Sequence, residues 1–186
     1  MTRTARQTRE ERREQALSAA REEFARAGMQ GSVDLIADRA GVTPSYLLRL
    51  FGTKKALFLA VVERAFDHTL SEYQQATNGK AGNEALQAIQ SMHRWLSRHD
   101  RVTGMIQLQA FAACDDEDVR AVVATGYGRI VEFVLSVSDV TPPELARFMA
   151  YGMQRRALAA LQMTSSRGAP KWAQLLHNGA TADLAV

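Results

Sequence analysis

Residues 32–55 read SVDLIADRAGVTPSYLLRLFGTKK, and this stretch decides the fold of the N-terminal part of the chain. Apolar residues at helical spacing followed by Gly41 predict a short helix, because glycine ends a helix cheaply in the left-handed conformation. Thr43 then caps a second helix, and Pro44 suits its first position. Two short helices joined in this way are typical of a helix-turn-helix, whose second helix enters the major groove of DNA.

The polar face of the second helix holds the candidate DNA-reading residues. A helix in the groove needs short polar side chains near its N-terminus and a longer donor that reaches a base edge or a phosphate. We expect this role for Thr43, Ser45, Tyr46 and Arg49. The alternative interpretation is a polar helix face that contacts solvent only.

Basic residues gather around this motif. The net charge of the chain is +3, and residues 1–55 contain eleven Lys or Arg against seven Asp or Glu. Lys54 begins the following helix, where an ammonium and free backbone N–H groups together favour a phosphate, whereas we expect Lys55 to be solvated. Arg3, Arg6 and Arg9 are expected to precede the first helix, and either enter the minor groove as an arm or remain a solvated tail.

Two segments, AREEFARAG (20–28) and SVDLIADRAGVTPSYLLRLFGTKKALF (32–58), resemble the DNA-binding domain of TetR-type repressors. The residues that fit this family's pattern are Phe24, Gly28, Ile36, Ala37, Ala40, Gly41, Val42, Thr43, Leu47, Phe51, Thr53, Lys54 and Leu57. Two departures are Leu48, where the family usually has a tyrosine that touches DNA phosphate, and a segment between Gly28 and Ile36 that is about one residue short. The resemblance implies a phosphate contact for Lys54 and a homodimer whose last long helices pack as a four-helix bundle.

The rest of the chain also reads as helical, so we predict an all-α fold. Its N-terminal three-helix helix-turn-helix unit is followed by a larger helical domain, with a boundary between residues 1–52 and 53–186. Local signals set the expected helix starts: capping boxes at Thr8 to Glu11 and Thr141 to Glu144, caps at Thr53, Asn83 and Asp100, and an acidic run at 115–118. A last short helix is expected around Trp172.

Composition excludes several classes of protein. No apolar run approaches the length of a membrane span, and residues 1–15 lack the apolar stretch of a secretory signal. One cysteine, Cys114, permits no intrachain disulfide, so we expect a cytoplasmic protein. The four histidines lack metal-ligand spacing, and neither a nucleophile setting nor a phosphate-binding glycine loop is present. We therefore expect no metal, no cofactor and no enzymatic activity.

The larger domain contains residues that suit a pocket for a small apolar or aromatic molecule, because large adaptable side chains can line such cavities. The candidates are Met92, Trp95, Met105, Phe111, Tyr127 and Phe133, with Gln107 and Gln109 as possible polar anchors of which at least one should face solvent. Ordinary core packing is the alternative for each of them. A separate apolar stripe on the last long helix is expected at the dimer interface, and consists of Leu145, Phe148, Met149 and Met153. Arg155 and Arg156 interrupt that helix and need water or acid partners.

These observations together indicate a ligand-responsive transcriptional regulator, which we expect to be a homodimeric repressor. It would bind a palindromic double-stranded operator and leave it when a small effector binds. One alternative is a helical-bundle protein that binds a small molecule, or an enzyme, without a DNA role. Another is a DNA-binding regulator that has no small ligand.

Overall fold

The computed structural model describes residues 8–165 and 167–182, and over these residues all regular secondary structure is helical. The predicted all-α fold is therefore confirmed. The helices are α1 (Arg9–Ala27), α2 (Val33–Arg39), α3 (Pro44–Phe51), α4 (Lys54–Ala76), α5 (Gly82–His99), α6 (Arg101–Ala112), α7 (Glu117–Val137), α8 (Pro142–Ala160) and α9 (Lys171–Ala182), with a 3-10 turn, η1 (Gly28–Gln30), after α1.

Most helices begin where a side chain caps free backbone N–H groups. Thr8 and Glu11 form the expected reciprocal pair at α1, with hydrogen bonds of 2.7 and 3.2 Å. The caps predicted at Thr53 and Asp100 are also present, and within the acidic run Asp116 caps α7. These contacts span three residues at most, so the chain can make them before any tertiary packing exists.

The cap predicted at Asn83 is wrong. α5 begins one residue earlier, at Gly82, and its N-cap residue Ala81 makes no side-chain hydrogen bond. Gly82 has φ +56°, and a carboxylate oxygen of Asp139 lies 2.9 Å from the point where a Cβ would be. The left-handed backbone at this crowded position moves the start of the helix away from Asn83.

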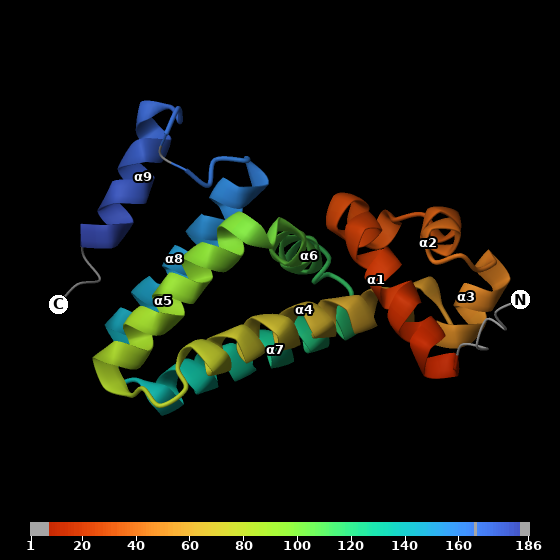
Figure 1. Cartoon of the computed structure of the whole chain (residues 1–186), viewed down its shortest axis with the longest axis horizontal. Coiled ribbons are helices and arrows are strands. Elements are labelled where there is room, and N and C mark those ends of the chain that lie inside the picture. The colour runs from red at the N-terminus through yellow and green to blue at the C-terminus, as the bar shows by residue number, and fades with distance from the viewer. Residues whose placement is uncertain (1–7, 166, 183–186) are drawn as a thin grey trace, which may run out of the picture.

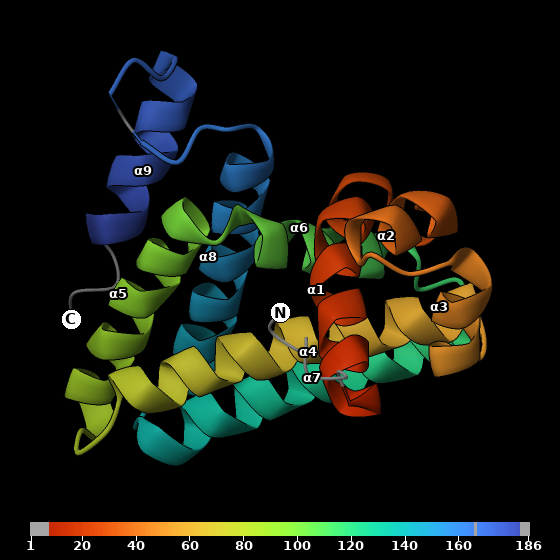
Figure 2. The ribbon, with the colours of Figure 1, turned by 45° about the vertical axis from the view of Figure 1, so that its right-hand side comes forward.

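The helices form a small N-terminal unit and a larger body. α1, α2 and α3 lie together at one end of the molecule, and the long helices α4 and α7 run side by side away from them (Figure 1). α4 and α7 run in the same direction, since Lys55 pairs with Asp116 near one end and Asp67 pairs with Arg129 further along. α5 and α8 form a second adjacent pair, and α6 lies between this pair and α1 (Figure 2).

A continuous apolar core joins the two parts. The Phe24 and Phe58 rings meet edge to face, 5.2 Å apart, and link α1 to α4. Further along, the Phe111 ring lies between those of Phe66 and Tyr127. A rigid connection of this kind lets α4 belong to both parts at once. None of the described helices is both long enough and apolar enough to cross a bilayer.

Candidate DNA-binding interface and C-terminal cavity

α3 presents a polar face to solvent because its apolar face is packed on the N-terminal unit. Leu47 is fully buried, while Ser45 and Arg49 are exposed and Tyr46 is half-buried. Thr43 caps the helix by accepting a hydrogen bond from the Tyr46 backbone N–H at 3.2 Å. The Thr43 hydroxyl therefore keeps its own proton, which is available to an acceptor such as a phosphate oxygen.

The two largest candidate reading residues lie against each other. The guanidinium carbon of Arg49 is 5.0 Å from the centroid of the Tyr46 ring, which is a cation–π distance. The contact restricts both side chains before any DNA arrives. A restricted guanidinium loses less conformational entropy when it binds a base edge.

Lys54 and Lys55 are adjacent but have different environments. Among the described residues, no carboxylate forms a salt bridge with Lys54, which is the first residue of α4. The ammonium of Lys55 contacts Asp116 at 3.0 Å and Asp118 at 2.6 Å, and these hydrogen bonds raise its pKa. Our expectation of a solvated Lys55 was wrong, because the start of α7 lies beside the start of α4. Of the candidate arm, Arg3 and Arg6 lie outside the described residues, whereas Arg9 is the first residue of α1 and therefore belongs to a helix.

Glu23 supports the candidate DNA-binding interface, and we did not predict this role from the sequence. Its side chain is 1% exposed and accepts hydrogen bonds from Arg26 at 2.7 Å and from the Ser32 backbone N–H at 2.9 Å. The bonds from Arg26 and then Ser32 lower the pKa of the Glu23 carboxyl. Glu23 thereby fixes the short segment that leads into α2. An acidic residue within the apolar stripe of α1 was the signal available in the sequence.

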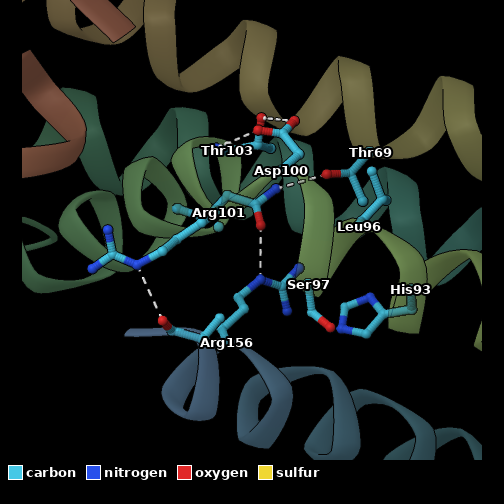
Figure 3. Close-up of a pocket in the computed structure, with 11 residues that line it drawn as sticks. Thr69, His93, Leu96, Ser97, Asp100, Arg101, Thr103 and Arg156 are labelled. Carbon is cyan, nitrogen blue, oxygen red and sulfur yellow. Dashed lines mark hydrogen bonds between the residues drawn. The ribbon is translucent and has the colours of Figure 1, made fainter. Parts of the chain in front are cut away.

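A cavity of about 30 Å³ lies in the C-terminal body between α4, α5, α6 and α8 (Figure 3). This volume holds about two water molecules. The lining residues are Thr69, His93, Leu96, Ser97, Asp100, Arg101, Thr103, Gly104, Gln107, Arg156 and Ala159. A smaller cavity of about 10 Å³ is lined by Tyr73, His93, Tyr127, Ile130, Phe148, Met149, Gly152 and Arg156. His93, on α5, and Arg156, on α8, border both.

The residues predicted to bind a ligand are not brought together. Gln107 lines the larger cavity and Tyr127 lines the smaller one, whereas Met92, Met105, Phe111 and Gln109 line neither. The three apolar residues among these pack against the core, and the Gln109 side chain lies against Gly28 at the end of α1. Trp95 is 51% exposed, where its ring stacks on that of His99 at 4.7 Å. Its position on the outer side of α5 removes it from both cavities.

The side chains that border both cavities form a polar network. Arg156 donates from Nε to the Oε1 of Gln107 at 2.7 Å, and the Nε2 of Gln107 donates to the Ala65 carbonyl and to the Thr69 hydroxyl. His93 hydrogen-bonds the Tyr73 hydroxyl through Nδ1 and the Gly152 carbonyl through Nε2. Burial, with Arg156 nearby, lowers the pKa of His93 to about 3, so this ring is neutral at physiological pH.

The predicted dimer stripe on α8 faces largely inward. Phe148 is 4% exposed within its own subunit, and both Phe148 and Met149 line the smaller cavity. Phe148 shares this cavity with Tyr73, His93 and Ile130, so in the single subunit its side chain is turned away from any second copy. Leu145 also packs against the core, and Met153 is half-buried. The large exposed apolar residues near this end of the chain are Leu161, Trp172, Leu175 and Leu176.

No three His, Cys, Asp or Glu side chains gather as a possible metal site in the part of the chain that the structure describes. The two cavities offer hydrogen-bonding and cationic groups together with apolar walls. Such a set can bind and orient a small molecule.

Comparisons with known proteins bear on both parts of the molecule. Residues 16–61 match the model of the family described as bacterial regulatory proteins, tetR family. The HTH-type transcriptional activator FasR of Mycolicibacterium smegmatis is 42% identical over 76 residues, which are 40% of this chain and 35% of FasR. The chain thus spans about a third of the length of that curated relative.

Solved structures resemble the whole fold. GusR of Salmonella enterica superposes with a TM-score of 0.69 at 17% identity, covering 94% of this chain and 96% of GusR. FadR of Bacillus subtilis, solved in complex with stearoyl-CoA, superposes with a TM-score of 0.67 at 17% identity, covering 92% of this chain and 97% of FadR. At such identities the likeness establishes the fold alone.

Proposed function

Since this chain belongs to the TetR family of DNA-binding transcriptional regulators, we propose that it acts as a homodimeric, ligand-responsive repressor of a palindromic operator. The observation that carries the proposal is the exposed polar face of α3 beside Lys54, a lysine without a carboxylate partner among the described residues. Two such faces in one dimer would enter successive major grooves.

A dimer is supported by the apolar residues exposed at the end of α8 and on α9. We call Leu161, Trp172, Leu175 and Leu176 the α8–α9 surface; they are between 40% and 71% exposed. Exposed alanines at 146, 150 and 157 lie along α8, where small side chains would let a second helix approach closely. Exposed apolar side chains of this size are typical of a protein interface.

Effector control is supported by the continuity of α4. Lys54 begins this helix, and Thr69 and Tyr73 on the same helix border the two cavities. Lys54 and Thr69 are about 22 Å apart along the helix at 1.5 Å per residue. A ligand that shifts the far part of α4 would therefore change the spacing of the two reading helices. The ligand carried by the similar FadR structure shows that this fold can hold a small molecule in that protein.

Replacing Lys54 with alanine is expected to weaken binding to every DNA sequence about equally. Log affinity falls with log salt, and each lost phosphate contact makes this negative slope less steep by about 0.9; a dimer loses two contacts. Binding to operator fragments selected from genomic DNA, measured over a salt series, tests this. Lys55→Ala is the matched control, since Asp116 and Asp118 already hold that ammonium. A loss confined to one base position, or an equal change of slope in both variants, would contradict the phosphate role.

Arg49→Ala is expected to change which sequences are bound. If Arg49 reads a guanine, the variant loses ~1–3 kcal/mol of discrimination at a single base position. Tyr46→Phe removes only the hydroxyl and keeps the ring under the guanidinium, so it isolates any phosphate bond of Tyr46 from its support of Arg49. Selection and sequencing of bound DNA gives the consensus for each variant. An unchanged consensus and affinity in both variants would refute α3 as the reading helix.

Activation is a second candidate for the mode of regulation, because FasR, to which the N-terminal part is similar, is named as an activator. A reporter gene behind the selected operator separates the two. Repression predicts higher expression when the regulator is deleted, and activation predicts lower expression. Failure to enrich any genomic fragment would favour a helical protein that binds a small molecule without a DNA role.

A further inference from the structure

Arg156 is a buried cation that has no anionic partner in the described structure. Its residue surface is 8% exposed, and its Nε is held by the neutral carbonyl oxygen of Gln107. None of the described salt bridges involves Arg156, and no further hydrogen bond is made by its two terminal nitrogens among the described residues. Arg156 lines both cavities.

The neighbours of Arg156 do not compensate its charge. Asp100 borders the larger cavity, but its carboxylate is already bound by Thr103, His68 and Arg21. Arg155, the next residue, is also buried and contacts Ser97 and His177 rather than a carboxylate. The remaining groups at the junction, His93, Tyr73 and Gln107, are neutral. Two adjacent guanidinium groups therefore make this part of the interior strongly positive.

Burial of an unpaired guanidinium is costly, because desolvation removes its water and nothing anionic replaces it. This desolvation is also the first cause that lowers the pKa of Arg156. An apolar residue of similar volume would cost the fold less. A buried cation of this kind that faces a cavity is typical of a binding site rather than of a structural core.

The two cavities differ in character on either side of Arg156. The larger one carries hydroxyl groups of Thr69, Ser97 and Thr103, as Figure 3 shows. The smaller one is lined mainly by apolar side chains, among them Ile130, Phe148 and Met149. At about 10 Å³ the smaller cavity is too small for an alkyl chain, so its walls must move when a ligand enters. The flexible side chain of Met149, with Phe148 beside it, can repack around such a chain.

We propose that Arg156 binds the anionic head, a carboxylate or a phosphate, of an otherwise apolar effector. The head group lies in the larger cavity within reach of the terminal nitrogens of Arg156, and the apolar part extends toward Ile130, Phe148 and Met149. This inference rests on the proposed function of the cavity as an effector site, and it replaces a purely apolar or aromatic ligand with an amphipathic anion.

The test compares three probes with the same ten-carbon chain: decanoate, decyl phosphate and 1-decanol. Calorimetric titration of the full chain is expected to show that at least one of the two anions binds 10- to 100-fold more tightly than 1-decanol, since a bond between charged groups in a buried site adds about this much. The stronger of the two anions identifies the head group. Equal binding of 1-decanol and both anions, or no binding of either anion, would overturn the inference.

Two variants remove the cation in different ways. Arg156→Met keeps an unbranched but shorter side chain and deletes the charge. Gln107→Glu keeps Arg156 but supplies an internal carboxylate at the atom that now lies 2.7 Å from its Nε. Both are expected to lose the preference for an anion over 1-decanol. Arg156→Met is also expected to raise the unfolding temperature of the ligand-free protein, because it removes an uncompensated charge. The exposed Arg147 on the same helix gives the control Arg147→Met, which keeps the preference.

Arg156→Lys is a control for the possibility that Arg156→Met and Gln107→Glu lose binding only because they fail to fold. It keeps a positive charge and is expected to retain a reduced preference for the anion. A preference that persists in both Arg156→Met and Gln107→Glu would assign the head group to another site and overturn the inference.

A DNA-binding measurement with each probe separates this inference from the proposed function. If an anion binds through Arg156 but leaves DNA affinity unchanged, the anion site is supported and the proposed control of DNA binding by an effector is contradicted. A neutral apolar compound that releases DNA while both anions do not bind would sustain ligand control and contradict the role of Arg156.

Discussion

A chain in which Leu161 and Leu175 are both replaced by glutamate is expected to be a monomer and to lose at least about 100-fold of affinity for a palindromic operator. Both leucines belong to the α8–α9 surface, and they are 56% and 71% exposed in the single subunit. Charges placed there disfavour burial against a second copy, while the subunit itself loses little because neither side chain is in its core. A monomer contacts only one half-site, so it lacks the additional affinity that a dimer obtains by binding two half-sites at once.

Sedimentation measures the oligomeric state, and binding to full and half palindromes measures the affinity. Leu135→Glu on α7 is the control, since that leucine is 47% exposed and lies outside the α8–α9 surface. Phe148→Glu would not serve as a test, because a charge at that buried position would unfold the subunit. An intact dimer in the double variant would move the interface to another face of the molecule.

Gly126→Ala is expected to destabilise the protein by about 1–3 kcal/mol, although alanine is the better helix former. A Cβ at Gly126 would lie 2.5 Å from a ring carbon of Phe66, which is fully buried where α7 packs on α4. The ring lies inside the core and cannot move aside without disturbing its contact with Phe111. The added methyl group therefore forces the two longest helices apart.

Gly128→Ala is the matched control on the same helix, because no atom lies within 4 Å of its added Cβ. This variant is expected to stabilise the protein by about 0.5–1 kcal/mol through helix propensity alone. Denaturant titration of both variants measures the difference. A Gly126→Ala variant as stable as Gly128→Ala would show that α4 and α7 are not packed as closely as described here.

The positions of the helices could be predicted from the sequence because their signals are local. Thr8, Thr53, Asp100 and Asp116 cap helices through N–H groups at most three residues away. The reading helix was recognisable in the same way, since Thr43 and Pro44 start it and its apolar and polar faces alternate with a helical period. These interactions depend on neighbours in the chain and therefore appear in the sequence itself.

Tertiary structure decided which faces of the helices are buried within the subunit and which are exposed. Helical periodicity shows that α8 has an apolar face, but it does not show whether that face is covered by its own subunit or by another, and Phe148 proved to be inside. The same limit applies to Trp95, whose helix has an outer side that the pattern did not reveal.

The candidate effector site was visible only in the folded chain. Arg156 meets Gln107 across 49 residues, and Lys55 meets Asp116 across 61. Whether an arginine finds an acid, an amide or water depends on which distant helix packs beside it, and no local pattern encodes that choice. The sequence by itself determined most helix starts and the polar face of α3, whereas the packing of α4, α5, α6 and α8 placed between two cavities a cation that has no anionic partner among the described residues.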